Sequence, residues 1–151
     1  MIALLSRLLK KDIIQKKPND NKDDIATVKW VKGKNDKYHR LMMVNENSPA
    51  LIQQSAVFVV WEKWGNKITW LYVGSTENMA KTVYKLKNDP EIAKHEEKGR
   101  VGITWAVLNP KFRSRVAAYL KKVLNPIIEN PDLTEHSNFE GEPFAVHPPI
   151  V

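Results

Sequence analysis

Two segments in the middle of the chain have the residue pattern of strands. Residues 56–64 and 68–75 are rich in β-branched and aromatic side chains, which favour strands. Gly65 and Asn66 stand between these segments and favour a tight turn, so the pattern predicts a β-hairpin. Residues 102–108 are nearly all apolar, and they predict a third strand in the interior of the sheet.

The segment after this hairpin predicts a helix. Ser75 or Thr76 supplies its cap, because a hydroxyl group can accept a hydrogen bond from a free backbone N–H at a helix start. Apolar residues then follow at spacings of three and four, which places on one face Met79, Val83 and Leu86.

Two more helices follow, each preceded by a capping residue and opened by a proline. One begins after Asp89, reaches about residue 97 and ends at Gly99. The other follows Asn109, and its predicted buried stripe consists of Phe112, Val116, Leu120 and Val123. We therefore expect an α+β fold in which helices pack on a small, mixed three-stranded sheet.

The first 24 residues have a different pattern of apolar and polar positions from the middle of the chain. Residues 1–17 predict an amphipathic helix, with apolar side chains on one face and most basic side chains outside it. Residues 18–24 contain one proline and otherwise only polar residues, which is typical of a linker. We expect two parts, residues 1–24 as helix and linker and residues 25–151 as a single domain.

Two further features are predicted within that domain. Residues 27–44 contain two runs of alternating apolar residues separated by Gly-Lys-Asn-Asp, and they predict an additional N-terminal hairpin. From Asn125 onward, repeated prolines predict an extended C-terminal tail without regular structure.

The composition narrows the class of protein. A length of 151 residues suits one compact domain, and 42% hydrophobic with 27% charged residues excludes a disordered chain. The sequence contains no cysteine, which excludes disulfides, thiolate metal ligands and a cysteine nucleophile. The lack of cysteine fits a reducing compartment, so we expect a cytoplasmic location.

The net charge of +7 is concentrated near the N-terminus. Residues 1–40 hold 11 basic and 5 acidic residues, whereas residues 41–151 hold 13 and 12. An anionic partner, either nucleic acid or a lipid surface, is a reasonable expectation for such a chain. Three interpretations of residues 1–17 stay open: docking on the domain itself, peripheral binding to an anionic membrane, or binding to a protein partner.

The strand VFVVW, the hairpin and the run YVGSTENMAKTV entering a helix resemble the GIY-YIG nuclease domain. The third strand and the helix that ends in VLNPII fall where that family has corresponding elements. The resemblance covers roughly residues 55–130, about half of the chain. It implies a GIY-YIG-like sheet flanked by helices.

The resemblance also marks the positions where that family carries its catalytic groups. Tyr72 and Gly74 keep the second strand motif, but Phe58, Thr82 and Ala117 stand where the family has tyrosine, arginine and a metal-binding glutamate. These residues can neither activate a water molecule nor hold a metal ion on the scissile phosphate. We therefore expect no catalytic residues, no metal and no cofactor; a metal-dependent endonuclease with an altered active site is the minor alternative.

Basic side chains around the corresponding groove suggest a binding function instead. The residues predicted to contact nucleic acid are Lys81, Lys85, Arg113, Arg115 and Lys121. Trp64, at the hairpin turn, is the best candidate for base stacking or a protein contact. The leading hypothesis is a non-catalytic nucleic-acid-binding module, and the alternative is a protein-interaction adaptor or one tethered to a membrane surface.

Overall fold

The computed structural model describes residues 14–15, 25–134 and 142–151. Most of the predicted N-terminal helix and the predicted linker at 18–24 lie outside these residues. Ile14 and Gln15 do not continue a helix, because they form the short strand β1 (Ile14–Gln15). The prediction of a helix through residue 17 is therefore wrong at its C-terminal end, where the backbone pairs with another strand instead.

The centre of the molecule is a four-stranded sheet in the order β3-β6-β4-β5. Its long strands are β4 (Ala56–Trp64), β5 (Lys67–Thr76) and β6 (Arg100–Val107), which confirms the three strands predicted from the sequence. Every neighbouring pair is antiparallel, so the prediction of a mixed, three-stranded sheet is wrong. The fourth strand, β3 (His39–Arg40), joins the open edge of β6.

The additional hairpin predicted at 27–44 does not form. Its first arm, β2 (Thr27–Val28), pairs with β1, whereas its second arm, β3, pairs with β6. The 3-10 turns η1 (Lys34–Asp36) and η2 (Leu41–Met43) flank β3. The exposed backbone of β6 competes for this segment, since the Val31 N–H donates to the Trp105 carbonyl at 2.9 Å.

The three helices predicted within the domain, over residues 79–124, are present. The first, α2 (Met79–Lys87), buries Met79, Val83 and Leu86 as predicted. Its cap is Asn78, whose side-chain oxygen accepts from the Lys81 N–H at 3.3 Å. Ser75 and Thr76 still belong to β5, so the predicted cap was placed too early.

The remaining helices follow their predicted signals. Helix α3 (Pro90–Lys98) is capped by Asp89 and ends at Gly99, and α4 (Pro110–Leu124) is capped by Asn109. The buried stripe of α4 was wrong at Val123, which is 46% exposed. The stripe continues instead through Leu124, one four-residue step after Leu120, and Leu124 packs against the core.

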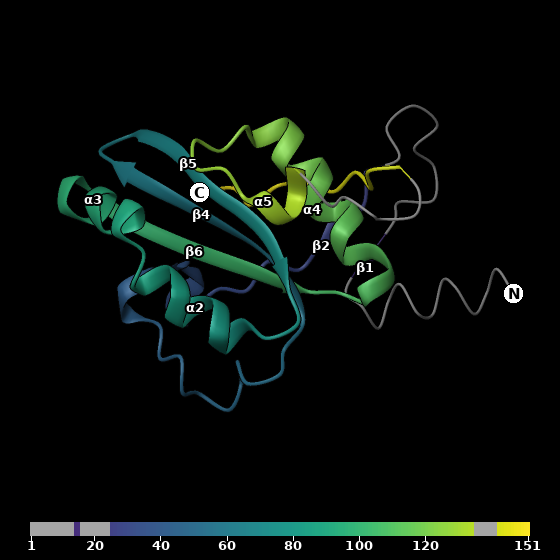
Figure 1. Cartoon of the computed structure of the whole chain (residues 1–151), viewed down its shortest axis with the longest axis horizontal. Helices are drawn as coiled ribbons and strands as arrows, with labels where there is room; N and C mark the ends of the chain where they lie inside the picture. Colours follow the sequence, from purple (N-terminus) through teal and green to yellow (C-terminus); the bar gives the residue numbers. More distant parts are fainter. Residues whose placement is uncertain (1–13, 16–24, 135–141) are drawn as a thin grey trace, which may run out of the picture.

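The sheet separates two apolar cores, because successive side chains of β4 point to opposite faces. Val57, Val59 and Trp61 face α4, together with the segments near both chain ends. Phe58 and Val60 face α2 and α3. Figure 1 shows α4 on one side of the sheet and α2 on the other.

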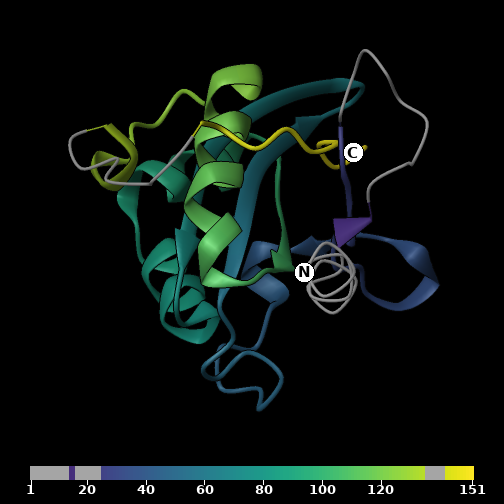
Figure 2. The ribbon, with the colours of Figure 1, turned by 90° about the vertical axis from the view of Figure 1, so that its right-hand side faces the viewer.

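The C-terminal tail has more regular structure than the sequence predicted. Backbone N–H groups of Ile127 and Ile128 donate to carbonyls of Trp70 and Leu71, which covers the open edge of β5. A one-turn helix, α5 (Pro131–Thr134), follows, and Val146 later bridges to Ala26. In Figure 2 the yellow C-terminal segment crosses past α4 toward β2. Within the described residues, no helix has the length and apolarity needed to cross a bilayer.

Candidate functional site

Three of the positions marked by the family resemblance lie together in one small cavity of about 250 Å³. We call it the Tyr72 cleft; Phe58 and Tyr72 line it from the sheet, and Thr82 and Lys85 line it from α2. The rings of Phe58 and Tyr72 stack with centroids 5.9 Å apart. The pairing of β4 with β5 and the packing of α2 on the sheet thus bring these residues together.

Gly74 is required beside this cleft because other groups occupy the space of a side chain. A Cβ atom at this position would lie 2.6 Å from Cζ of Phe58 and 2.7 Å from Nδ2 of Asn130. Asn130 is buried, and its amide group donates to the Val73 carbonyl at 3.0 Å. Gly74 therefore lets the C-terminal segment close one wall of the Tyr72 cleft.

The surroundings of Tyr72 keep its phenol protonated. Burial raises the pKa of Tyr72 above its ordinary value, and the nearby carboxylates of Asp132 and Asp89 raise it further. A tyrosine that activates water must give up its proton easily, so this environment does not favour a role as general base.

The raised pKa predicts how Tyr72→Phe changes the pH dependence of stability. Above pH 10 the unfolded chain releases the phenolic proton while the folded chain keeps it, so the free energy of unfolding falls as pH rises. We expect this alkaline fall to be shallower in Tyr72→Phe, measured by urea unfolding at several pH values. Tyr84→Phe, at a side chain that is 58% exposed, serves as the control. Equal slopes in the two variants would contradict the prediction.

The residues predicted from the last helix lie on the other side of the sheet. Ala117 is fully buried in the core beneath α4. Arg113 is also buried, and its Nε and Nη1 atoms have no hydrogen-bond partner among the described residues. Its Nη2 atom lies 3.9 Å from Glu77, and burial lowers the pKa of this guanidinium while Glu77 opposes the change.

The other predicted cations differ in their availability. Arg115 donates to the Glu142 carbonyl at 2.7 Å and lies over the ring of Phe144, and Lys121 lies 3.8 Å from Glu129. Lys81 and Lys85 are exposed on α2, and Lys85 reaches the Tyr72 cleft. The five predicted cations are therefore divided between two faces of the sheet and do not surround one groove.

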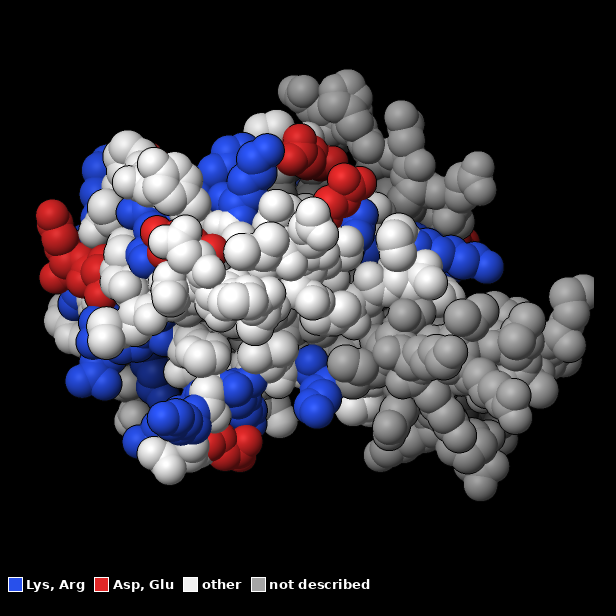
Figure 3. All heavy atoms as spheres, turned by 90° about the horizontal axis from the view of Figure 1, so that it is seen from below, with Lys and Arg blue, Asp and Glu red and all other residues white. Residues whose placement is uncertain are grey.

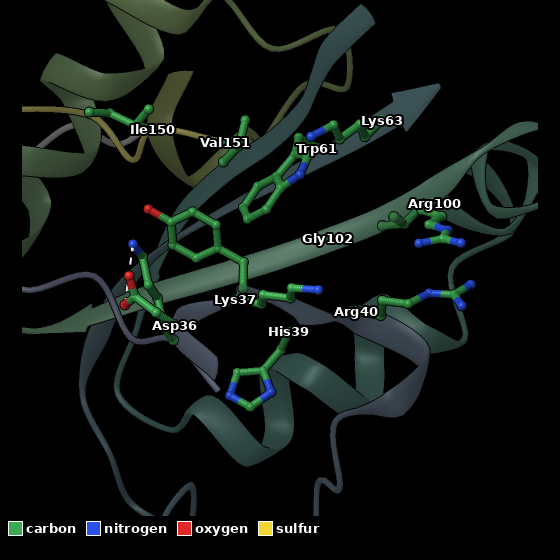
Figure 4. A pocket seen from close by; sticks show the side chains of 13 residues that line it. Asp36, Lys37, His39, Arg40, Trp61, Lys63, Arg100, Gly102, Ile150 and Val151 are labelled. Atoms are coloured by element: carbon green, nitrogen blue, oxygen red, sulfur yellow. Dashed lines mark ion pairs between the residues drawn. The ribbon is translucent and has the colours of Figure 1, made fainter. Parts of the chain in front are cut away.

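A larger cavity of about 390 Å³ lies at the opposite end of the sheet (Figure 4). We call it the Trp61 pocket, and its walls come from β3, β4, β6 and the end of the C-terminal segment. Five lysine or arginine side chains and one carboxylate side chain line it. The basic members are Lys32, Lys37, Arg40, Lys63 and Arg100.

An indole ring forms the floor of the Trp61 pocket. Trp61 is only 4% exposed, and its ring lies over Gly102, where a Cβ atom would be 2.5 Å from Cε2 of the indole. Tyr38 meets Trp61 edge to face at 5.3 Å. The pocket thus combines a tightly packed aromatic floor with a rim of long basic side chains.

Three of the five basic rim residues have no carboxylate partner in the part of the chain that the structure describes. Arg40 pairs with Glu96 at 2.7 Å, and Lys32 lies 3.6 Å from Asp36. Within the described residues, no carboxylate lies within 4.0 Å of the charged groups of the other three basic side chains, which are Lys37, Lys63 and Arg100. These three cations can therefore attract an anion without first breaking an ion pair with a described carboxylate.

Two of these cations are direct cross-strand neighbours. Lys63 on β4 is opposite Arg100 on β6 in the sheet register. Like charges in such positions destabilise a sheet. Figure 4 shows Lys63, Arg100 and Arg40 along one side of the pocket. Folding alone gives no reason for this arrangement, whereas an anionic ligand would turn the repulsion into attraction.

The same two cations line a second depression of about 380 Å³, which we call the Trp64 pocket. Its other residues are Trp64, Gly65 and Gly99. Trp64 is 67% exposed, in contrast to Trp61. Lys63 and Arg100 therefore line two pockets, one that contains the buried Trp61 and one that contains the exposed Trp64.

Sequence reasoning identified Trp64 but missed the basic rim. The rim residues come from three separate stretches of the sequence, at 32–40, 63 and 100, and the pairing of β3, β6 and β4 brings these stretches together. Two signals pointed toward it: the excess charge of residues 1–40 and the run Trp61-Glu62-Lys63-Trp64, which combines aromatic and basic residues.

The described residues contain no cluster of side chains suited to a metal ion. Among the described residues, no three histidine or acidic side chains lie close enough together to hold a metal ion. No protein-family model, no curated protein and no solved structure matches this chain. The likeness to GIY-YIG domains therefore stays a prediction from the strand motifs.

Proposed function

We propose that this chain is a nucleic-acid-binding module on a GIY-YIG-like fold and that it does not hydrolyse its ligand. The single observation that carries the proposal is the cross-strand pair of Lys63 and Arg100, two cations held side by side at the mouth of two pockets. A polyanion with regularly spaced charges suits such a pair, because each phosphate can neutralise the repulsion between them.

Two features support the fold and the absence of hydrolysis. Strand β4 pairs with β5, and Phe58, Tyr72 and Thr82 line one cleft, whereas Ala117, expected at the same groove, does not line it. Phe58 and Thr82 offer neither a phenol nor a guanidinium there, and Ala117 is buried on the far side of the sheet. The cleft therefore lacks the first tyrosine, the arginine and the metal-binding glutamate that the resemblance would require for hydrolysis, although Lys85 lines it.

Lys81 and Lys85 on α2 form the alternative surface for nucleic acid. Figure 3 views the molecule from the side of α2 and shows lysine and arginine side chains in separate groups around a broad uncharged area. Separated cations can contact a phosphate chain individually. A cavity lined by several cations has a stronger positive potential than separated cations on a surface. Five basic residues line the Trp61 pocket, so we favour this pocket as the main contact for nucleic acid.

The test compares two double variants that each remove two positive charges. A fluorescent oligonucleotide is titrated with three proteins between about 50 and 200 mM salt. They are the unmodified chain, Lys63→Ala/Arg100→Ala and Lys81→Ala/Lys85→Ala. Each phosphate contact contributes about 0.7 to 0.9 to the log–log salt slope. We expect the first variant to lower the slope by about 1.5 and the second to leave it nearly unchanged.

Each outcome of this comparison decides one question. A loss confined to Lys81→Ala/Lys85→Ala would move the interface to α2 and contradict the assignment to the pocket. Equal small losses would indicate attraction by bulk charge alone. If the full chain binds no nucleic acid at low salt, the proposed function is wrong. Cleavage of the oligonucleotide with Mg²⁺ or Mn²⁺ would contradict the non-catalytic part.

A further inference from the structure

The Trp61 pocket and the Trp64 pocket share two lining residues, Lys63 and Arg100. We infer that they form one binding site for single-stranded nucleic acid. The two cations hold a phosphodiester, the base on one side stacks on Trp64, and the neighbouring nucleoside enters the Trp61 pocket. This inference rests on the proposed function and specifies its ligand as unpaired strands.

Trp64 is suited to stacking by its position. It lies at the end of β4, next to the turn at Gly65, whose φ of 60° reverses the chain. Its indole is 67% exposed, although burying an indole elsewhere in the fold would stabilise the protein. An exposed indole gives a base a π-face to stack on, and Lys63 and Arg100, which line the same depression, give its phosphate a charge to pair with.

The Trp61 pocket is suited to a nucleoside by its size and its walls. Its volume of about 390 Å³ lies in the range of small-molecule sites, about 300–1,000 Å³. Tyr38 and the C-terminal Ile150 and Val151 contribute apolar surface to the walls. The ammonium group of Lys32 lies 4.9 Å from the centre of the Tyr38 ring, which fixes this wall beside the basic rim.

A duplex cannot use this arrangement. Its bases are paired and stacked on each other, so their faces are not available to an indole on the protein surface. Only phosphates would reach Lys63 and Arg100 from a duplex. A single strand can instead offer a phosphate to the two shared cations and a free base to each of the two pockets that they line.

The experiment measures the affinity of the full chain for three probes of equal length by fluorescence anisotropy. The probes are a single-stranded oligothymidine, the same strand with abasic sites in place of bases, and a duplex. The variants are Trp64→Ala, Trp64→Phe and the control Tyr84→Ala, which removes an aromatic ring that is 58% exposed on α2. Circular dichroism verifies that each variant is folded.

Stacking is worth about 1–3 kcal/mol per base, so Trp64→Ala should weaken binding of oligothymidine roughly tenfold. We expect Trp64→Phe to recover part of this loss and Tyr84→Ala to cause none. On the abasic strand and the duplex, Trp64→Ala should have almost no effect, because neither offers a free base to stack.

The results separate this inference from the function on which it rests. The inference is wrong if Trp64→Ala binds oligothymidine as tightly as the unmodified chain does. It is also wrong if the affinity of Trp64→Ala falls by the same factor for all three probes. In that case a reduced salt slope in Lys63→Ala/Arg100→Ala would still support nucleic-acid binding through phosphates. If none of the probes binds at low salt, both the inference and the proposed function are wrong.

Discussion

Trp61→Ala is expected to lower the free energy of unfolding by about 4 kcal/mol, because removal of a buried aromatic side chain costs both its transfer free energy and the cavity left behind. Trp61 is 4% exposed and contacts Trp70 and Tyr38 edge to face. The chain around it is held by two strands and cannot collapse to fill the space. Urea unfolding followed by far-ultraviolet circular dichroism measures the change.

Trp64 provides the matched control for this prediction. It is the same residue type, three positions further along the same strand, but its side chain is 67% exposed. We expect Trp64→Ala to change the unfolding free energy by less than about 0.5 kcal/mol. Similar losses in the two variants would contradict the assignment of one indole to the core and the other to a ligand.

The second large effect is expected from Gly102→Ala, which should lower the free energy of unfolding by about 3 kcal/mol. The added Cβ atom would lie 2.5 Å from Cε2, 2.6 Å from Cζ2 and 2.7 Å from Nε1 of Trp61. Gly102 is in the interior strand β6 and pairs with both Trp61 and Arg40. Neither the rigid indole nor the paired backbone can move away cheaply.

A smaller ring at position 61 should reduce this penalty. We expect the loss caused by Gly102→Ala to be at least about 1 kcal/mol smaller in the Trp61→Phe background than in the unmodified chain, since directly contacting residues couple by amounts of this size. Urea unfolding of the four proteins of this double-mutant cycle provides the coupling energy. An additive result would show that the cost does not come from the contact with Trp61.

The long strands β4, β5 and β6 and the helices α2, α3 and α4 were determined locally, and the sequence alone was enough to find them. The hairpin of β4 and β5 follows from β-branched and aromatic residues on either side of Gly65 and Asn66. Helices α3 and α4 follow from a capping residue and a proline at their start. In these cases the signal and the structure lie within the same few residues, and the tertiary contacts agree with the local preference.

Segments with weak local preference were decided by tertiary contacts. Residues 27–44 carry a hairpin pattern, but β2 found a partner in β1 and β3 found one at the edge of β6. Two-residue strands contribute few hydrogen bonds of their own, so the available sheet edge determines where they pair. The cap of α2 moved to Asn78 for a similar reason, since pairing with β4 keeps Ser75 and Thr76 in the sheet.

The sequence determined which residues this protein has for binding an anion, and the tertiary structure decided which of them act together. Trp64 could be selected in advance, because an aromatic residue beside a turn is seldom buried. The pair of Lys63 and Arg100 could not, because their proximity depends on the register between β4 and β6, strands separated by a hairpin and two helices. Charges act through space, whereas a sequence pattern records only distance along the chain.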